Sequence, residues 1–289
     1  MGDTTVSAIG LGGMPLSIEG RPDQARAVAT IHAALDAGIT FIDTADAYTL
    51  DADGPGHNEL LVAAALASYP GDTSKVLVAS KGGLIHHDGP GQWERKGTTE
   101  HLMKAARDSR ARLGVESIGL YQFHAPDPRV DYRESVTAIR DLLDEGVIRM
   151  AGISNASIAQ IEIAQEVLGG RLVSVQNRLS PISRDSLPEL EYCAKHEIAF
   201  LPWSPLGGIG NGKDVFASQH VFTEIADELS DDAHKVSPQQ VTLAWELALE
   251  HVVIPIPGST RPESITDSAL AADLVLTAEQ LERLSADPA

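Results

Sequence analysis

The sequence predicts an α/β protein folded as a closed (β/α)8 barrel. Short apolar runs alternate with longer segments of helical spacing, which is the pattern of a parallel sheet built from strand–helix units. Eight such units can be counted, and no proline- or serine-rich linker or change in composition separates them. A length of 289 residues suits one barrel or two ordinary domains. Because no linker is present, we expect residues 1–289 to form a single barrel domain.

The expected strands are the short apolar runs. They lie at 9–12, 40–43, 76–80, 118–123, 149–153, 172–175, 198–203 and 252–256. Residues 4–7 are expected to add an N-terminal strand or hairpin that covers the floor of the barrel.

The expected helices lie at 25–37, 59–68, 99–113, 133–144, 158–168, 187–196, 238–250 and 262–272. Gly38, Gly114 and Gly146 follow three of them, where a left-handed cap would end the helix. A further helix is expected at 221–229, before the last unit. Irregular loops are expected at 49–56, 82–97, 180–186 and 207–214.

Charge and cysteine content restrict the classes of partner. A formal net charge of −19 disfavours nucleic acid and anionic membranes, which would repel this surface. Cys193 is the single cysteine, so the chain has no internal disulfide and suits a reducing compartment. The sequence begins with no leader pattern and has no membrane-spanning apolar stretch. We therefore expect a cytoplasmic protein, a monomer or small homo-oligomer, that acts on a small molecule.

Four residues at or just past strand ends resemble one catalytic constellation: Asp43, Tyr48, Lys81 and His124. A buried lysine needs a partner, and Asp43 on the neighbouring strand can supply it. That pair alone could be purely structural. Tyr48 favours catalysis, because an adjacent ammonium would lower a phenol pKa from its ordinary value of about 10. His124 could hydrogen-bond a carbonyl oxygen beside the phenol.

Motifs spread along almost the whole chain form a family pattern. They are Gly10-Leu11-Gly12-Gly13-Met14, Asp43-Thr44-Ala45 with Tyr48, Ser80-Lys81, His124, Gly152-Ile153-Ser154-Asn155, Val175-Gln176-Asn177, Ser204-Pro205-Leu206-Gly207 and Ile256-Pro257-Gly258. With these motifs the chain resembles the aldo-keto reductases. The resemblance implies a (β/α)8 barrel, NADPH bound across its C-terminal face, and reduction of an aldehyde or ketone to an alcohol. By position, Tyr48 would be the general acid, Lys81 and Asp43 its tuning pair, and His124 the residue that orients the substrate.

The resemblance also implies a cofactor site. Ser154 and Asn155 resemble the pair that binds the nicotinamide carboxamide, and Gln176 resembles its third polar contact. Trp203 stands where the family often stacks an aromatic residue on the nicotinamide, although a core tryptophan is an equal alternative. The loop residues Ser204, Pro205, Leu206, Gly207 and Gly208 resemble the strap that binds the pyrophosphate. The resemblance also includes Gly12, Gly13 and Met14 in this site.

The adenosine end is expected at the last strand–helix unit. Ser259, Thr260 and the amides of a helix that begins near residue 262 could bind a 2′-phosphate, and Arg261 would complete the charge. Gly258 and Ser264 stand where many NADPH-dependent relatives have lysine and arginine, which leaves NADH open as an alternative. Asp267 and Ser268 could reach the adenine, and solvated surface is the alternative for both.

Substrate choice and two other functions stay open. Trp93, in a loop that resembles the branches described as pyridoxal reductases or broad aldehyde reductases, is expected to wall the substrate pocket. The adjacent residues His86-His87-Asp88 are unsuited to converge on one ion, so no metal is expected. A noncatalytic NADP-binding regulatory subunit is one alternative function. A Schiff-base lyase or aldolase that uses Lys81 is another, and Asp43 opposes it by favouring the charged amine.

Overall fold

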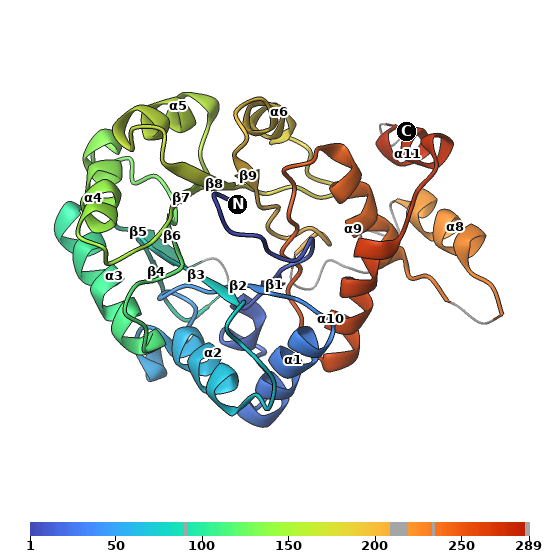
Figure 1. Ribbon diagram of the computed structural model, residues 1–289, viewed down its shortest axis with the longest axis horizontal. Coiled ribbons are helices and arrows are strands. Elements are labelled where there is room, and N and C mark those ends of the chain that lie inside the picture. The colour runs from blue at the N-terminus through green and yellow to red at the C-terminus, as the bar shows by residue number, and fades with distance from the viewer. Residues whose placement is uncertain (90–91, 209–218, 233–234, 287–289) are drawn as a thin grey trace.

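The computed structural model describes residues 1–89, 92–208, 219–232 and 235–286. Seven parallel strands form one curved sheet in the order β1-β2-β3-β6-β7-β8-β9, and helices surround it (Figure 1). The strands are β1 (Leu11–Gly12), β2 (Phe41–Asp43), β3 (Leu77–Gly82), β6 (Leu120–Phe123), β7 (Ala151–Ser154), β8 (Leu172–Gln176) and β9 (Ala199–Phe200). Each coincides with an expected strand, and the predicted barrel architecture is confirmed.

The eighth segment of the barrel wall, residues 252–258, is hydrogen-bonded on both sides but is not a regular strand. On the side of β9, the N–H of Ile254 donates to the carbonyl of Phe200 at 2.9 Å. On the side of β1, two N–H groups donate to proline carbonyls, Gly10 to Pro255 at 2.8 Å and Gly12 to Pro257 at 2.9 Å. A proline has no N–H, so Pro255 and Pro257 cannot donate across this seam, although Gly12 and Gly258 form an isolated parallel bridge. The expected strand at 252–256 therefore closes the barrel without forming a complete ladder.

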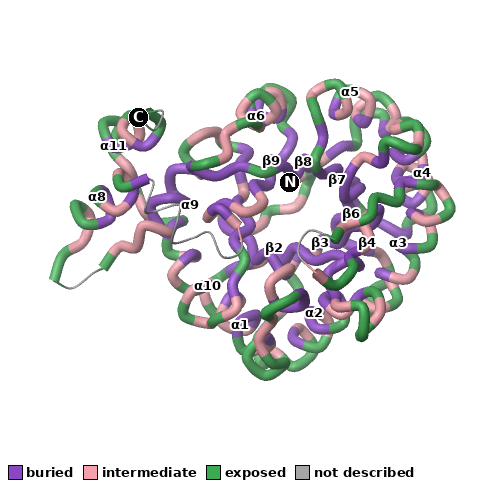
Figure 2. Tube along the Cα trace, turned by 180° about the vertical axis from the view of Figure 1, so that it is seen from behind, coloured by how far each residue is buried: buried purple, intermediate pink, exposed green. Residues whose placement is uncertain are grey.

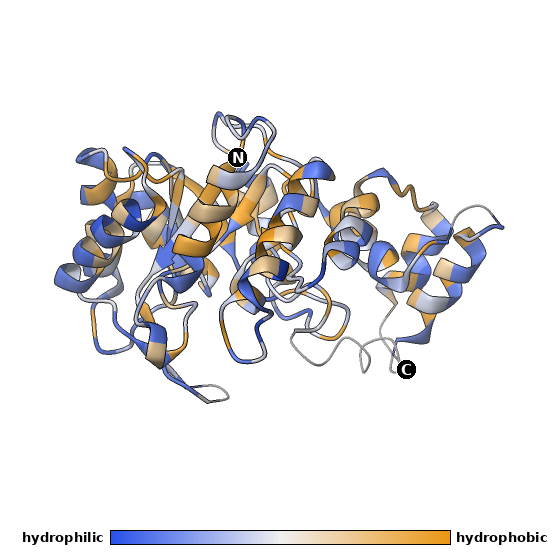
Figure 3. Ribbon diagram, turned by 90° about the horizontal axis from the view of Figure 1, so that it is seen from below, coloured by the Kyte–Doolittle hydropathy of each residue, from blue (hydrophilic) through white to orange (hydrophobic). Residues whose placement is uncertain are grey.

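Helices form the outer layer of the ring (Figure 1). They are α1 (Gln24–Asp36), α2 (His57–Ser68), α3 (Thr99–Leu113), α4 (Tyr132–Asp144), α5 (Ile158–Val167), α6 (Leu187–Lys195), α9 (Pro238–Leu249) and α10 (Pro262–Ala269). The expected caps Gly38, Gly114 and Gly146 have φ angles of 82°, 68° and 73°, as a left-handed cap requires. The strands and the inward sides of the helices are buried (Figure 2), and apolar residues gather there (Figure 3).

Two helices lie beside α9, outside the ring (Figure 1). The first, α8 (His220–Leu229), was expected, and the second, α11 (Ala278–Ser285), was not. They bury Phe222 and Leu284 against Trp245 of α9. No helix in the described part of the chain has the length and apolar character needed to cross a bilayer.

The loop expected at 82–97 contains an unexpected hairpin. Strands β4 (Leu84–His86) and β5 (Trp93–Arg95) pair antiparallel, and His86 lies opposite Trp93. Short 3-10 helices occur at Met14–Leu16, Asp51–Asp53 and Leu270–Asp273, the second of them inside the loop expected at 49–56. Of the loop expected at 207–214, residues 209–214 lie outside the described residues.

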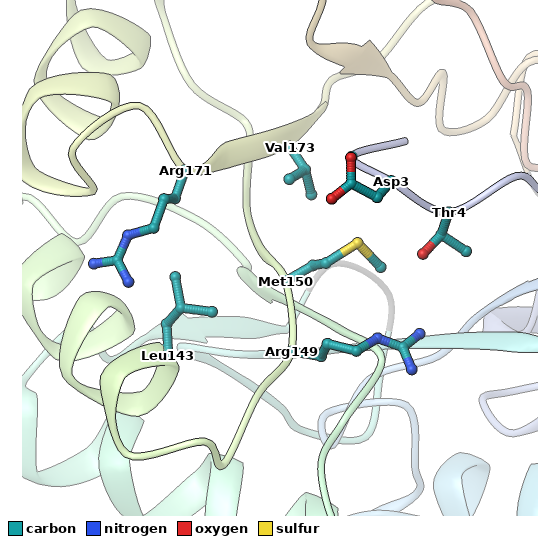
Figure 4. Close-up of a pocket in the computed structure, with 8 residues that line it drawn as sticks. Asp3, Thr4, Leu143, Arg149, Met150, Arg171 and Val173 are labelled. Atoms are coloured by element: carbon teal, nitrogen blue, oxygen red, sulfur yellow. The ribbon is translucent and has the colours of Figure 1, made fainter.

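The N-terminal residues reach the floor of the barrel without forming the expected strand. Gly2 lies close to Met150 and Val173, beside the first residues of β7 and β8. The N–H groups of Ser7 and Thr40 donate to each other's side-chain oxygens at 2.8 and 2.9 Å, so side chains replace a strand ladder here. A surface cavity of about 420 Å³ lies at this end, between Asp3, Thr4, Arg149 and Met150 (Figure 4).

The proline-rich seam makes the barrel sensitive to substitution at Gly12. A Cβ atom at this position would lie 2.7 Å from the carbonyl oxygen of Ile256, so the backbone would have to shift. Gly12→Ala should lower the free energy of unfolding by about 1–3 kcal/mol, measured by urea denaturation. Gly71→Ala is the matched control, because the three atoms nearest to the added methyl belong to the side chain of Tyr69 and not to the backbone. Equal stability of the two variants would show that the seam is not tightly packed.

Candidate active site

The four residues of the predicted constellation meet at the C-terminal end of the barrel. Lys81 Nζ, at the end of β3, donates to Asp43 Oδ2 of β2 at 2.5 Å and to the Tyr48 hydroxyl at 2.9 Å. It also donates to the carbonyl of Thr44 at 3.1 Å. The rings of Tyr48 and His124 meet edge to face, with centroids 5.7 Å apart. The register of β2 and β3, which pairs Asp43 with Ala79, brings these groups together because Lys81 lies two residues further on.

Asp43 connects the lysine to two further strands. Its Oδ1 accepts hydrogen bonds from Gln176 Nε2 of β8 at 2.8 Å and from Gln122 Nε2 of β6 at 3.3 Å. The predicted cofactor residue Gln176 thus commits its side-chain Nε2 to Asp43, which leaves its side-chain oxygen Oε1 for other contacts. Gln122 was not predicted, although a polar residue within the apolar run 120–123 is a sign of a position that faces a polar interior.

Lys81 is charged in this site. Burial alone would lower the pKa of Lys81, but the Asp43 carboxylate and Tyr48 outweigh burial and raise it. The side chain has no exposed surface. A nucleophilic lysine must be neutral, so this environment opposes Schiff-base chemistry.

Tyr48 differs from the sequence-based expectation. Burial raises the pKa of Tyr48 above its ordinary value, and the lowering effect of the Lys81 ammonium does not overcome it. Lys81 lowers the Tyr48 pKa as expected, but burial outweighs it, and the cost of desolvating a phenolate could not be inferred from the sequence. The phenol stays protonated at neutral pH and is able to donate.

His124 is a neutral imidazole. Burial, together with the Lys81 ammonium, holds the pKa of His124 well below its ordinary value. Its Nδ1 is buried and has no hydrogen-bond partner in the described part of the chain. A neutral imidazole has one N–H, and in the tautomer protonated at Nε2 it can donate to an oxygen beside Tyr48.

The hairpin β4–β5 supplies one wall of the site. Trp93 meets the Tyr48 ring edge to face at a centroid separation of 6.4 Å. The His86 ring packs on Trp93 at 4.4 Å, and His86 Nδ1 lies 2.8 Å from the carbonyl oxygen of Thr49. Met14 and Trp93 pack against a small apolar cluster that includes Tyr48. The loop expected at 82–97 contains both residues, and the hairpin register brings the His86 ring onto Trp93.

The predicted nicotinamide residues form a connected set. Ser154 Oγ donates to the carbonyl of Gln176 at 2.8 Å. Asn155 has a positive φ of 57°, and its Nδ2 donates to the carbonyl of His124 at 3.0 Å. Trp203 Nε1 donates to Asn155 Oδ1 at 3.2 Å. Trp203 is half-buried: it packs against the apolar cluster that contains Phe41 and Leu201, and the Arg178 guanidinium lies over its ring, 5.7 Å from the centroid.

The loop predicted as the pyrophosphate strap is a tight turn. Ser204, Gly207 and Gly208 have positive φ angles of 53°, 90° and 98°, and the N–H of Gly207 donates to the carbonyl of Ser204 at 2.9 Å. Successive N–H groups in such a turn can form a concave anion site. Pro205 is buried, and Leu206 packs on the apolar cluster that contains Leu11. These residues fit a dinucleotide phosphate.

The glycine-rich start of the chain is held close to the catalytic strand. The N–H of Gly13 donates to the carbonyl of Asp43 at 2.7 Å. A Cβ at Gly13 would lie 2.5 Å from Asn58 Oδ1, so only glycine fits. Asn58 Nδ2 donates to the carbonyl of Gly13 at 2.8 Å, and Thr44 Oγ1 donates to Asn58 Oδ1. Asn58 was not predicted, because nothing near it in the sequence indicates these contacts.

At the expected adenosine end, Arg261 is exposed and occupies the N-cap position of α10 without a side-chain cap hydrogen bond, and Pro262 follows in the first turn. Ser259 Oγ donates to the carbonyl of Arg261 at 2.8 Å and shapes this corner, where Gly258 is exposed and Thr260 half-exposed. The helix N-terminus and the guanidinium fit a phosphate.

Asp267 and Ser268 are used inside the protein. The Asp267 carboxylate accepts from Ser237 Oγ at 2.6 Å and from Gln240 Nε2 at 2.7 Å, which joins α10 to α9. Ser268 is buried, and its hydroxyl donates to the carbonyl of Ser264 at 3.0 Å. The expected adenine contacts of Asp267 and Ser268 therefore find no support in this structure.

Among the described residues, no group of three or more histidine, cysteine or acidic side chains is arranged to hold a metal ion. His87 lies 3.6 Å from Asp51 and 3.9 Å from Glu94, and His86 faces Thr49 and Glu19. Cys193 is buried, and burial raises the pKa of its thiol to about 12.

Comparison with known proteins gives one family. The model described as "Aldo/keto reductase family" matches residues 8–286. A 6-dehydroglucose reductase from Novosphingobium aromaticivorans is 33% identical over 269 residues, which cover 92% of this chain and 86% of that protein.

Solved structures agree with this match. The glycerol dehydrogenase of Gluconobacter oxydans superposes with a TM-score of 0.80 at 29% identity, covering 98% of this chain and 91% of that one. An aldo/keto reductase from Klebsiella pneumoniae, in complex with NADP and acetate, superposes with a TM-score of 0.76 at 26% identity, covering 96% and 89% of the two chains.

Removing one partner of the buried ion pair should destabilise the protein strongly. Asp43→Ala leaves the Lys81 ammonium without its carboxylate in a site closed to water. The free energy of unfolding should fall by about 3–5 kcal/mol, measured by chemical denaturation. The double variant Asp43→Ala/Lys81→Met is the control and should recover part of the loss. A single-variant loss below about 1 kcal/mol would mean that water reaches the pair.

Proposed function

Because the chain belongs to the aldo/keto reductase family, we propose that Tyr48, Lys81, Asp43 and His124 are the catalytic residues of an NADPH-dependent carbonyl reduction. Membership makes the protein an NAD(P)H-dependent oxidoreductase, and NADP or NADPH is bound in solved relatives. The observation that carries the residue assignment is the hydrogen bond from a fully buried Lys81 to the Tyr48 hydroxyl.

Tyr48 is the proton donor in this mechanism. NADPH, when bound, supplies a hydride to the carbonyl carbon. The Tyr48 O–H donates its proton to the carbonyl oxygen, which becomes the alcohol, and Tyr48 is left as a phenolate. The Lys81 ammonium at 2.9 Å stabilises that phenolate, and a proton from solvent restores the phenol. Asp43 keeps Lys81 charged and fixed throughout.

His124 orients the substrate. Its neutral ring lies edge to face with Tyr48, so a carbonyl oxygen placed between them can accept from both side chains. A neutral histidine does not compete as the acid, because its N–H is a far weaker acid than an imidazolium. This arrangement assigns proton donation to Tyr48 and alignment to His124.

The substrate is proposed to be an aldehyde or ketone, and its pocket is bounded by Tyr48, His124 and Trp93. One relative is a 6-dehydroglucose reductase and another is a glycerol dehydrogenase. Sugars and other polyhydroxylated carbonyl compounds are therefore the first substrates to test. An assay panel of simple aldehydes, ketosugars and pyridoxal, followed by NADPH oxidation, would identify the class.

The cofactor is proposed to lie along the residues that fit it. Ser154, Asn155 and the side-chain oxygen Oε1 of Gln176 would hold the carboxamide. Trp203 would lie against the nicotinamide ring. The turn at Ser204–Gly208, beside Gly12, Gly13 and Met14, would hold the pyrophosphate. Gly258, Ser259, Thr260, Arg261 and Ser264 would surround the 2′-phosphate.

The remaining expectations are also proposals. Residues 1–289 would act as one domain, and the family model spans residues 8–286. The charge of −19 and the single buried cysteine support a cytoplasmic enzyme without nucleic-acid or membrane partners. We propose that it is a monomer or small homo-oligomer.

Tyr48→Phe removes the proposed proton donor and keeps the ring that packs on Trp93. Carbonyl reduction should fall by about 10²–10⁴-fold, and the Kd for NADPH should be nearly unchanged, measured by fluorescence titration. His124→Gln is the companion variant and should mainly raise KM for the carbonyl. If Tyr48→Phe reduced carbonyls at the wild-type rate, another group would have to be the acid.

Arg261→Ala tests the preference for NADPH. The exposed guanidinium should contribute about three- to tenfold to NADPH affinity, because only NADPH carries the 2′-phosphate. The KM for NADH should stay the same. Arg133→Ala, an exposed arginine of α4 paired with Glu166, is the control. An equal loss with both cofactors, or no loss with either, would contradict the assignment.

A further inference from the structure

A second buried group of ionisable residues lies behind the catalytic lysine. Ser80 precedes Lys81 in β3, so its side chain points to the opposite face of the strand, toward the outer helices. Ser80 Oγ donates to Glu59 Oε1, in the first turn of α2. Glu59 Oε2 accepts from Arg112 Nε of α3 at 2.6 Å. Glu59 is fully buried, and the Arg112 side chain is 17% exposed.

Asp46 belongs to this group but has no cation of its own. The residue is 6% exposed, and its Oδ1 is buried without a hydrogen-bond partner in the described part of the chain. The two nearby cations are already paired, Lys81 with Asp43 and Arg112 with Glu59. An unpaired buried carboxylate is costly, so Asp46 favours its neutral form. Burial, with a contribution from Glu59, raises the pKa of Asp46 to about 8.

The backbone of Asp46 belongs to the segment that places Tyr48. The N–H of Asp46 donates to the carbonyl of Lys81 at 3.4 Å, and its carbonyl accepts from the N–H of Gly56 at 2.7 Å. Tyr48 follows two residues later, and its N–H donates to the carbonyl of Ala45 at 3.3 Å. The Asp46 side chain is thus fixed at the outer side of the catalytic centre.

We propose that Asp46 is a positioning residue that sets the acidity of Tyr48 through its own protonation. As a neutral acid it adds no negative charge to that of Asp43, which already opposes the effect of Lys81 on Tyr48. As a carboxylate it adds a negative charge beside the site and makes Tyr48 a weaker acid. The inference deepens the proposed function and rests on it.

The groups that face Asp46 decide the direction of this effect. They are Glu59 from α2, Arg112 from α3, Lys81 from β3, Tyr121 from β6, and Tyr48 from its own segment. A charged Asp46 opposes formation of the Tyr48 phenolate, which is the base for alcohol oxidation. Ionisation of Asp46 therefore moves the ionisation of Tyr48 to higher pH and extends the range over which Tyr48 is an acid.

Asp46→Asn tests this role with a neutral side chain of the same shape. The pH profiles of carbonyl reduction and of alcohol oxidation with NADP should both shift to lower pH, by about half a unit or more relative to wild type. A purely structural role would scale activity by one factor at every pH. Asp53→Asn is the matched control, because it removes an exposed carboxylate from the same loop between β2 and α2. It should shift neither profile.

Unshifted profiles in Asp46→Asn, with Tyr48→Phe inactive, would overturn the inference and leave the proposed function intact. An active Tyr48→Phe enzyme would overturn both. A profile shift of the same size in Asp53→Asn would reduce the effect to surface charge and also overturn the inference.

A stability measurement tests the buried proton without any assay of activity. The pKa of Asp46 is raised on folding, so the stability that its proton provides is present at low pH and is lost as pH rises towards about 8. The Tm of Asp46→Asn minus that of wild type should increase between about pH 4 and pH 8. A difference that is constant over this range would mean that Asp46 is not a buried acid, and would overturn the inference.

Discussion

The buried ion pair between Asp43 and Lys81 constrains the rest of the catalytic end of the barrel. Two charges removed from water must satisfy each other and their remaining hydrogen-bonding positions inside the protein. Asp43 meets this demand with two inward glutamines, Gln122 and Gln176, so one carboxylate joins four strands. Lys81 uses its remaining donors on Tyr48 and the carbonyl of Thr44. The opposite half of the interior is an apolar cluster that includes Phe41, Leu120 and Leu201. The interior of the barrel is therefore polar at the end that holds the candidate catalytic residues and apolar at the other end.

The same burial that makes the pair necessary also sets the charge states of its neighbours. Removal from water favours the neutral form of an ionisable group. It therefore favours the phenol form of Tyr48 and the neutral imidazole form of His124. Two neutral donors can then face one carbonyl oxygen while the Lys81 ammonium contacts the phenol oxygen. Had Lys81 lowered the phenol pKa to neutrality, the proton needed for reduction would be partly lost before the substrate arrives. A weakly acidic Tyr48 is thus compatible with reduction, provided that Lys81 stabilises the phenolate as it forms.

The sequence was sufficient to predict features that depend on local pattern. Alternation of apolar runs and helical segments predicted the barrel, and strand ends predicted the meeting of Asp43, Lys81, Tyr48 and His124. Features set by distant contacts were missed. Pro255 and Pro257 fall in an apolar run but cannot donate across the closing seam. The register of β4 and β5 sets the contact of His86 with Trp93, and Asn58 donates to Gly13, 45 positions away. The net effect on the Tyr48 pKa depended on burial, whose magnitude a sequence does not contain.

The acidity of the chain limits how an anionic cofactor can be held. A charge of −19 repels phosphate at long range, but this repulsion is screened beyond about 8 Å at physiological ionic strength. Binding must therefore rely on contacts that act at short range. The positive-φ turn at Ser204–Gly208 and the start of α10 present backbone N–H groups, which carry partial positive charge without adding a titratable group. Arg261 adds one full charge, and Glu263 lies 3.7 Å from it. If the proposed cofactor site is correct, phosphate recognition by the described residues depends more on backbone geometry than on cationic side chains, and Gly258 at this site is an exposed glycine.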